Sequence, residues 1–190
     1  MNRRGRIIAA IGAAILALTT MFTGIGSALA ETQNPAPAPA LTDSQKQSLQ
    51  AEVNKHLKDY GGGRQIAINE IAYQNDRLIL TLPLPGEKKA RSLSEPVTTL
   101  GTANCSFEYA CLWTNTNFEG TRLSRYACET VTLAAPFTSS VGSIHNNQTT
   151  GTQTMLLNAS RQILNATLAP SRVNDTGVGT RYASRFWVVC

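Results

Sequence analysis

Four cysteines, Cys105, Cys111, Cys128 and Cys190, are the residues whose type and spacing point most directly to chemistry. An even number of cysteines without a C-x-x-C pair favours disulfide bonds over a redox or zinc site. Sequence alone leaves three connectivities open. We prefer Cys105–Cys111, which closes a tight loop, together with Cys128–Cys190. The chain-entropy relation gives these closures about 2 and about 4 kcal/mol of stabilisation.

Few other side chains point to catalysis. The two histidines, His56 and His145, belong to no H-E-x-x-H motif, and no serine lies in a Gly-x-Ser-x-Gly motif. We expect His56 on the solvated flank of a helix and His145 in an exposed turn. The sequence therefore predicts a protein that is not an enzyme and that has neither catalytic residues nor metal ligands.

The first thirty residues resemble an export signal. Basic residues Arg3, Arg4 and Arg6 precede an apolar run at residues 7–25, which is followed by Ala-Leu-Ala at 28–30. A basic region, an apolar region and an A-x-A cleavage site together predict a secretory signal peptide at residues 1–30. A membrane anchor is the alternative, but threonines and glycines dilute the apolar run. We expect a secreted, extracellular protein without membrane attachment after signal removal.

The net charge changes when the signal is removed. The chain has 17 Lys+Arg and 12 Asp+Glu, and its first thirty residues hold three arginines and no acidic residue. The exported part then carries a net charge of only +2. A chain with so little excess positive charge lacks the electrostatic footprint of a nucleic-acid-binding protein. We therefore predict no nucleic-acid partner.

A tether and a helix are expected after the signal. Residues 31–40 alternate Pro and Ala, which favours an extended tether. Thr42 and Gln45 form a capping-box pattern, and an apolar stripe at helical spacing follows. Three glycines at residues 61–63 predict the end of this helix.

A hairpin and a linker are expected next. Apolar runs at residues 65–73 and 77–82 flank a polar turn and predict two antiparallel strands. With the helix they form a small α+β segment at 41–86, which we interpret as an accessory segment or a pro-region. Residues 87–100 are charged and lack periodicity, so we expect a linker there. Its basic stretch at 88–91 fits a processing site.

Residues 101–190 hold all four cysteines and both tryptophans and are expected to form the main domain. Short β-prone runs recur there, separated by Asn- and Gly-rich turns, which predicts an antiparallel sandwich or small barrel. The expected strands are at residues 110–114, 121–126, 129–133, 153–157, 161–168 and 181–189. We expect Trp113 and Trp187 to fill the core of this domain.

The segment at residues 105–120 carries a family resemblance. A short Cys-to-Cys loop is followed at once by Trp113, Phe118 and Gly120, and the glycine lies seven positions after the tryptophan. This pattern resembles secreted actinobacterial proteins related to the Streptomyces metalloproteinase inhibitor. The resemblance implies a crystallin-like Greek-key β-sandwich, in which the glycine adopts positive φ and the aromatic ring covers its bare backbone.

Crystallin-like proteins often bind calcium, and two stretches of this chain correspond to their calcium motifs. Residues 139–144 have the sequence SSVGSI. Serines occupy the positions at which the crystallin calcium motif has residues with carboxylate or amide oxygens. Residues 174–177 read NDTG, for which a plain Asx-turn is the preferred interpretation. We therefore expect no cofactor, and calcium remains only an alternative.

The resemblance implies a monomeric inhibitor of extracellular proteases, zinc metalloproteases above all. A disulfide-braced, substrate-like loop loses little entropy on binding. The loop held by Cys128 and Cys190 is the preferred contact, and the Cys105–Cys111 loop with Phe107 is the alternative. No reactive bond is assigned from sequence. The competing hypothesis is a wall- or glycan-binding, antifungal-type module that stacks sugars on exposed aromatic residues, namely Tyr109, Trp113, Phe118, Tyr126 and Trp187.

Overall fold

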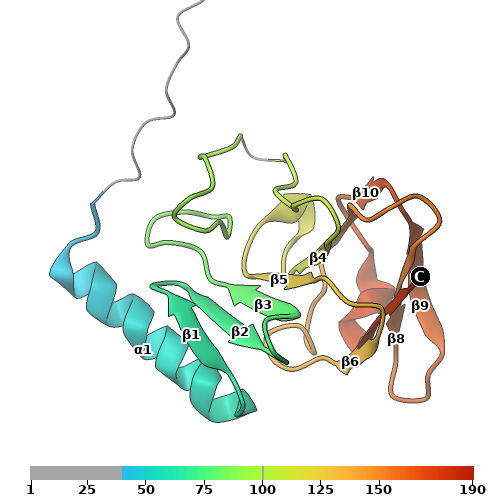
Figure 1. Ribbon diagram of the computed structural model, residues 1–190, viewed down its shortest axis with the longest axis horizontal. Helices are drawn as coiled ribbons and strands as arrows, with labels where there is room; N and C mark the ends of the chain where they lie inside the picture. The colour runs from blue at the N-terminus through green and yellow to red at the C-terminus, as the bar shows by residue number, and fades with distance from the viewer. Residues whose placement is uncertain (1–39, 100) are drawn as a thin grey trace, which may run out of the picture. The chain divides into compact units, whose positions relative to one another are not determined.

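The computed structural model describes residues 40–99 and 101–190 of the chain. The predicted signal peptide and nearly all of the tether lie outside these residues. Eleven strands, one α-helix and two short 3₁₀ helices make up the described part, and the strands form two antiparallel sheets (Figure 1). The prediction of a mainly β protein with two disulfides is confirmed at this level.

Helix α1 spans Asp43–Tyr60 and begins at the predicted capping box. The Thr42 hydroxyl accepts from the Gln45 amide at 3.3 Å, and the Thr42 amide donates to Gln45 Oε1 at 2.9 Å. The buried stripe includes Leu49, Val53 and His56. The prediction of a solvated His56 is wrong, because its position continues the apolar stripe at helical spacing and its ring stacks on Tyr60.

Three strands follow the helix: β1 (Arg64–Ala67), β2 (Glu70–Tyr73) and β3 (Leu78–Thr81). The single strand predicted over residues 65–73 is therefore two strands. Asn69 lies at the break and is fully buried, where its amide donates to the carbonyls of Leu82 and Arg91 at 2.7 and 2.8 Å. These bonds satisfy two backbone carbonyls that lie after β3 and connect the β1–β2 turn to that segment.

Eight further strands complete the two sheets. The first sheet has the order β1-β2-β3-β5-β4-β7-β10 and the second the order β6-β11-β8-β9. Strand β6 thus leaves the first sheet for the second, and β10 crosses in the opposite direction. The bounds are β4 (Ala110–Trp113), β5 (Arg122–Arg125), β6 (Thr130–Thr132), β7 (Ser143–Asn146), β8 (Gln153–Leu157), β9 (Ile163–Leu168), β10 (Ser171–Val173) and β11 (Arg185–Val189), with 3₁₀ helices η1 (Thr116–Phe118) and η2 (Val178–Tyr182).

The expected linker at residues 87–100 does not interrupt the sheet. Strand β3 pairs with β5 along its length, with Leu80 opposite Leu123, so the helix–hairpin segment and the main β region share one sheet. Residues on both sides of 87–100 belong to one compact unit. Lys89 and Arg91 within the expected processing stretch are buried, because a bridge from Lys89 to Gly120 holds this segment against the sheet.

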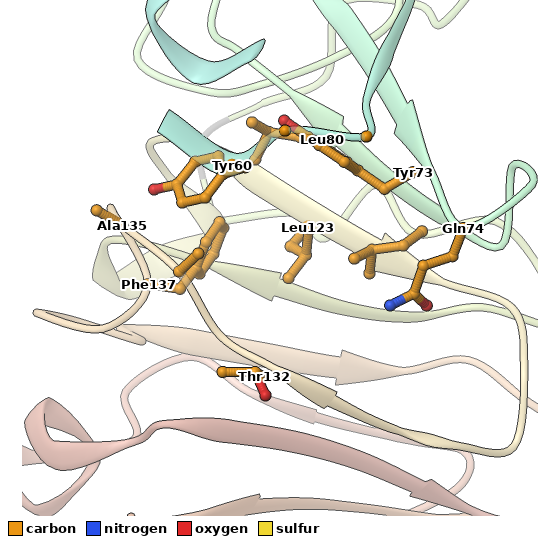
Figure 2. A pocket seen from close by; sticks show the side chains of 12 residues that line it. Tyr60, Tyr73, Gln74, Leu80, Leu123, Thr132, Ala135 and Phe137 are labelled. Carbon is orange, nitrogen blue, oxygen red and sulfur yellow. The ribbon is translucent and has the colours of Figure 1, made fainter. Parts of the chain in front are cut away.

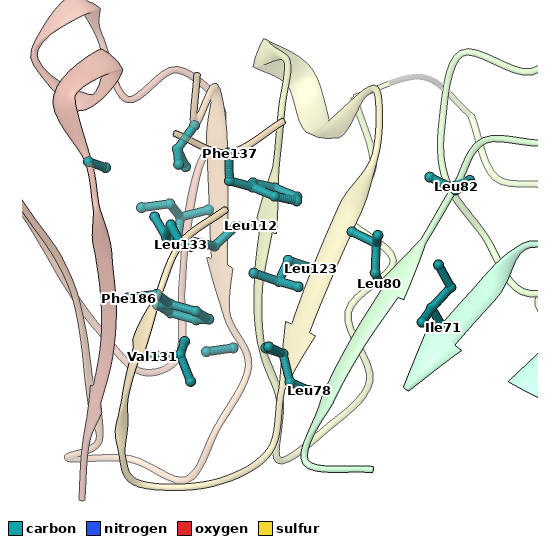
Figure 3. Close-up of a cluster of buried hydrophobic side chains, with 14 of the residues drawn as sticks. Ile71, Leu78, Leu80, Leu82, Leu112, Leu123, Val131, Leu133, Phe137 and Phe186 are labelled. Carbon is teal, nitrogen blue, oxygen red and sulfur yellow. The ribbon is translucent and has the colours of Figure 1, made fainter. Parts of the chain in front are cut away.

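The apolar core joins both sheets and the helix. Figure 3 shows Phe186 and Val131 of the second sheet facing Leu112 and Leu123 of the first. A smaller cluster combines Trp113 and Phe118 with the Cys105–Cys111 disulfide. Trp113 is therefore buried as expected.

Trp187 does not fill the core. Side chains alternate along β11, and Phe186 and Val188 point inward, so the intervening Trp187 lies on the outer face and is 37% exposed. The expected continuation of this strand back to residue 181 is also wrong. Tyr182 ends η2 and is 77% exposed.

One central strand, β7, carries little sequence signal. Strand β7 has the residues Ser-Ile-His-Asn and pairs with both β4 and β10, and all four of its residues are buried. His145 is thus buried in a strand, which contradicts its expected place in an exposed turn. Its neighbours Asn146 and Ser143 are polar, so the strand lacks the apolar alternation that sequence patterns detect.

Candidate functional site

Both disulfides lie at the same end of the β structure and follow the preferred pairing. Cys105 is bonded to Cys111 with a Cα–Cα distance of 5.9 Å, and Cys128 to Cys190 with a distance of 5.7 Å. Ala110, next to Cys111, pairs with Arg125 at the end of β5. The loop that contains Cys128 begins directly after Arg125, so the two disulfide-bonded loops start side by side.

The loop at residues 105–111 forms a tight turn. The Tyr109 amide donates to the Ser106 carbonyl at 3.2 Å, and Glu108 has a φ of 72°. Asn147 holds the loop from the neighbouring segment, because its side chain donates to the Cys105 carbonyl at 2.8 Å and its carbonyl accepts from the Glu108 amide at 3.0 Å. Such a closed turn is not the extended strand that a protease cleft accepts.

The loop at residues 126–130 is supported from behind by a buried arginine. The Arg125 side chain is fully buried and donates through Nε to the Ala127 carbonyl at 3.0 Å. Its two other nitrogens donate to Gln74 Oε1 and Glu129 Oε2, each at 2.9 Å. Burial lowers the pKa of Arg125, while the bond to Glu129 acts in the opposite direction. This bracing fixes the conformation of the loop, in which every residue but Ala127 is exposed.

The two loops meet through their aromatic residues. The ring centroids of Tyr109 and Tyr126 lie 5.7 Å apart in a tilted arrangement. Phe107 is 63% exposed and Tyr126 is 51% exposed. We call residues 105–111 and 126–130 together the two-loop surface. Exposed aromatic side chains on rigid, disulfide-bonded loops are typical of protein-binding surfaces.

The residues that carry the family resemblance have structural roles. Trp113 packs edge-on against Phe118, with ring centroids 5.2 Å apart. Gly120 has a φ of 78°, and a Cβ atom there would overlap the Thr114 hydroxyl. The positive φ expected from the resemblance is therefore present at this glycine.

The serines of the crystallin-type calcium stretch are engaged with backbone. Ser140 Oγ donates to the Thr114 carbonyl at 2.8 Å, and Ser143 Oγ donates to the Asn115 carbonyl at 2.7 Å. Asp175 accepts from the Gly177 amide at 2.8 Å, which is the expected Asx-turn. Within residues 40–99 and 101–190, His, Cys, Asp and Glu side chains form no group of three that could hold a metal ion.

His145 is the most strongly shifted histidine of the described chain. Burial, and to a smaller extent the charge of Arg172, lower its pKa to about 4. Arg172 Nε donates to His145 Nε2 at 3.3 Å, which keeps this nitrogen unprotonated. The imidazole is therefore neutral and enclosed in the first sheet, where His145 pairs with Cys111 of β4 and Arg172 of β10.

Sequence reasoning missed Arg125 and Asn147 as supports of the loops. Neither lies in a motif, and their roles depend on contacts with segments that are distant in sequence, such as Gln74 and Cys105. Strand β5 reads Arg-Leu-Ser-Arg, so no local pattern marks Arg125 as buried, and the polar partners that a buried arginine needs come from other segments.

Comparison of the chain with protein-family models, curated proteins and solved structures gives no match. None of the helices in the described residues combines the length and apolar character needed to span a membrane. Two disulfides are compatible with an extracellular protein.

Proposed function

We propose that this chain is a secreted, monomeric inhibitor of extracellular proteases, with zinc metalloproteases as the first candidates. The observation that carries the proposal is the exposed loop at residues 126–130, which is braced by a disulfide at Cys128 and by Arg125 from behind. A loop whose conformation is fixed beforehand loses little entropy on binding a protease cleft. The proposal includes export through the signal at residues 1–30 and no enzymatic activity of the chain itself.

We further propose a crystallin-like Greek-key fold for residues 101–190. The exchange of strands supports it, since β6 leaves the sheet of β4, β5 and β7 while β10 enters it. The packing of Trp113 on Phe118 and the positive φ of Gly120 are also the features that the family resemblance implies. The helix and hairpin then extend the Greek-key sheet at the edge formed by β5.

Within the two-loop surface, residues 126–130 are proposed as the primary contact. The Cys105–Cys111 loop forms a closed turn around Ser106 and Tyr109, whereas four of the five residues at 126–130 are exposed and only Ala127 is half-buried. Phe107 and Tyr126 would bury their exposed rings against the protease, as aromatic anchors do at protein interfaces.

The test is a stoichiometric titration of residues 31–190 against a thermolysin-like metalloprotease and, in parallel, a subtilisin-like serine protease. We expect saturating inhibition at one inhibitor per enzyme, with a nanomolar dissociation constant that corresponds to about 12 kcal/mol. Tyr126→Ala should weaken inhibition roughly 30-fold, which is the loss of about 2 kcal/mol typical of an interface anchor.

Tyr182→Ala is the matched control, because it removes an equally large exposed ring in η2, outside the two-loop surface. This variant should inhibit like the wild type. Steady digestion of the folded protein by both proteases would contradict the proposal, and so would equal effects of the two tyrosine variants.

A second candidate function, binding of an acidic wall glycan, is favoured by the surroundings of Trp187. Its indole lies in a hollow of about 370 Å³ together with Arg161 and Arg185. Neither arginine forms a salt bridge with any described residue. An indole face and two guanidinium groups suit a sugar ring that carries a carboxylate. Trp113 and Phe118 are buried and do not contribute to this surface.

A pull-down with insoluble cell-wall polysaccharide tests this candidate. Trp187→Ala should abolish retention, whereas Tyr126→Ala should leave it unchanged. Retention that depends on Tyr126 instead would place the glycan on the two-loop surface and contradict the role of Trp187.

A further inference from the structure

Three neighbouring strands of the first sheet end at the same level. Leu78 of β3 and Ala110 of β4 both lie opposite Arg125 of β5. Beyond these strand ends lie the β2–β3 turn at residues 74–77 and the two loops of the two-loop surface, so the three segments emerge side by side. The turn belongs to the helix–hairpin segment, but it lies at the same end of the sheet as the proposed protease contact.

The β2–β3 turn is bonded directly to the loop that follows β5. The Tyr126 amide donates to the Arg77 carbonyl at 3.1 Å. The Arg77 side chain donates to Glu129 Oε1, also at 3.1 Å. From behind, Arg125 Nη1 donates to Gln74 Oε1 at 2.9 Å. The main-chain bond and the buried Arg125 thus hold the turn against the loop, which brings the turn within reach of any partner that covers the loop.

The turn has an unusual backbone. Gln74, Asn75 and Asp76 have φ values of 53°, 55° and 67°, so three consecutive residues other than glycine are left-handed. Such residues normally occur singly, because this conformation is unfavourable for each of them. Arg125 holds Gln74 at one end of the run. At the other end, Arg64 Nη2 donates to both carboxylate oxygens of Asp76, at 2.7 and 2.8 Å. Strained backbone that the surrounding structure enforces is concentrated at functional sites.

Asn75 lies at the tip of the turn and is free to bind. All four residues at 74–77 are exposed. Figure 2 shows Gln74 at the opposite end from Tyr60 of the hollow that both residues line, so α1 ends away from the turn. Arginines hold Gln74 and Asp76, whereas no hydrogen bond within the described part of the chain involves the Asn75 side chain. Its amide offers donors and an acceptor, as the backbone of a partner protein does.

We infer that the β2–β3 turn is a third contact segment of the protease-binding surface, in which Asn75 contacts the enzyme. This inference rests on the proposed inhibition of proteases. The exposed rings of Phe107 and Tyr126 form the apolar centre of the surface, and the polar turn forms part of its rim, which is the usual arrangement of a protein interface. The helix–hairpin segment is then part of the working inhibitor rather than a pro-region.

Arginine substitution at the tip tests this contact in the titration against the metalloprotease. Asn75→Arg places a larger, charged side chain between the turn and the enzyme and should weaken inhibition at least tenfold. Asn117→Arg is the matched control, because Asn117 is also exposed, has a φ of 57° and lies in η1, beyond the other end of β4. This control should change inhibition less than twofold. The thermal midpoints of the two variants should fall by similar amounts, since both place arginine at nearly the same φ.

Hydrogen–deuterium exchange of the wild-type protein, alone and in complex with the protease, gives a second measurement. Amide protons at residues 74–77 should exchange at least tenfold more slowly in the complex, whereas those at 115–118 should not change. This measurement decides the question if Asn75→Arg does not fold.

The outcomes separate this inference from the proposed function. A wild-type protein that does not inhibit would contradict the proposed function and the third contact together. Inhibition that Tyr126→Ala weakens and Asn75→Arg leaves unchanged would overturn the third contact alone. Equal losses with Asn75→Arg and Asn117→Arg would also overturn it, and so would unchanged exchange at residues 74–77 in the complex.

Discussion

His145 shows how a single buried imidazole makes stability depend on pH. Its pKa is lowered from 6.5 to about 4 in the folded protein, so the unfolded chain binds a proton more readily. The free energy of unfolding should therefore decrease as the pH falls from about 6.5 to about 4, by up to roughly 3 kcal/mol from this residue. Above pH 6.5 the residue is neutral in both states and contributes no pH dependence.

Urea unfolding of the wild type and of His145→Gln over this pH range measures the effect. The difference between the two stability curves isolates His145, because His56 also has a lowered pKa and contributes in the same direction in both proteins. Parallel curves would show that His145 is not the group that titrates.

Gly120→Ala should destabilise the fold by about 3 kcal/mol. About 1 kcal/mol comes from the positive φ, and the remainder from displacing the Thr114 hydroxyl, which accepts from the Thr121 amide. Gly151→Ala is the control, because Gly151 also has positive φ but its added Cβ would meet no atom within 4 Å. Denaturant unfolding should give that variant a loss of only about 1 kcal/mol, and equal losses would exclude the steric explanation.

For single residues, the sequence predicted the features that depend only on residues close together in the chain. The tight Cys105–Cys111 loop follows from spacing along the chain, and the positive φ of Gly120 was implied by the family resemblance of the segment around it. The burial of His145 and the outward orientation of Trp187 depend on which strands neighbour them, and no local pattern contains that information.

The segment between β3 and β4 is attached to the sheet by buried ion pairs. Arg122 donates to both oxygens of Glu95, at 2.9 and 2.8 Å, and its side chain is only 5% exposed. Glu95→Gln should cost about 3 kcal/mol, because it removes the carboxylate that binds both terminal nitrogens of the buried Arg122. It should also release the segment, so that trypsin cleaves at residues 88–91 much faster than in the wild type.

Asp43→Asn provides the control for this prediction. The Asp43–Lys46 pair is exposed, so its loss should cost less than about 0.5 kcal/mol and leave the tryptic rate unchanged. Limited proteolysis with identification of the cleaved bonds checks both variants. Slow cleavage of Glu95→Gln would show that the segment is held mainly by other contacts.

Among the elements, α1 and most strands were predictable, because the helix cap and the β-prone runs are formed by residues that are close together in the sequence. The helix begins directly after Thr42, which forms the predicted capping box with Gln45. Strands β7 and β10 were not predicted, since β7 is short and rich in polar residues whose hydrogen bonds go to neighbouring segments. The segment at 87–100 was interpreted as a linker because its buried charges, Lys89 and Arg91, look solvated in sequence.

For the molecule as a whole, the helix–hairpin segment is expected to be necessary for folding. Leu78 and Leu80 of β3 belong to the same apolar cluster as Leu123 and Phe186. A fragment of residues 101–190 would expose this surface and the unpaired edge of β5. We expect it to aggregate or to unfold without cooperativity, whereas residues 41–190 should show a single thermal transition. A soluble, cooperative 101–190 fragment would support the pro-region interpretation instead.

The exchange of β6 and β10 between the sheets has a consequence for local opening. Residues 110–146 contain β6, which belongs to the second sheet, and residues 153–189 contain β10, which belongs to the first. Neither of these two segments can therefore detach without removing a strand from the sheet of the other. Amide protons of both sheets should therefore exchange with deuterium through one common opening, with the same free energy. A protease or ligand that stabilises one loop would then slow exchange in strands it never touches.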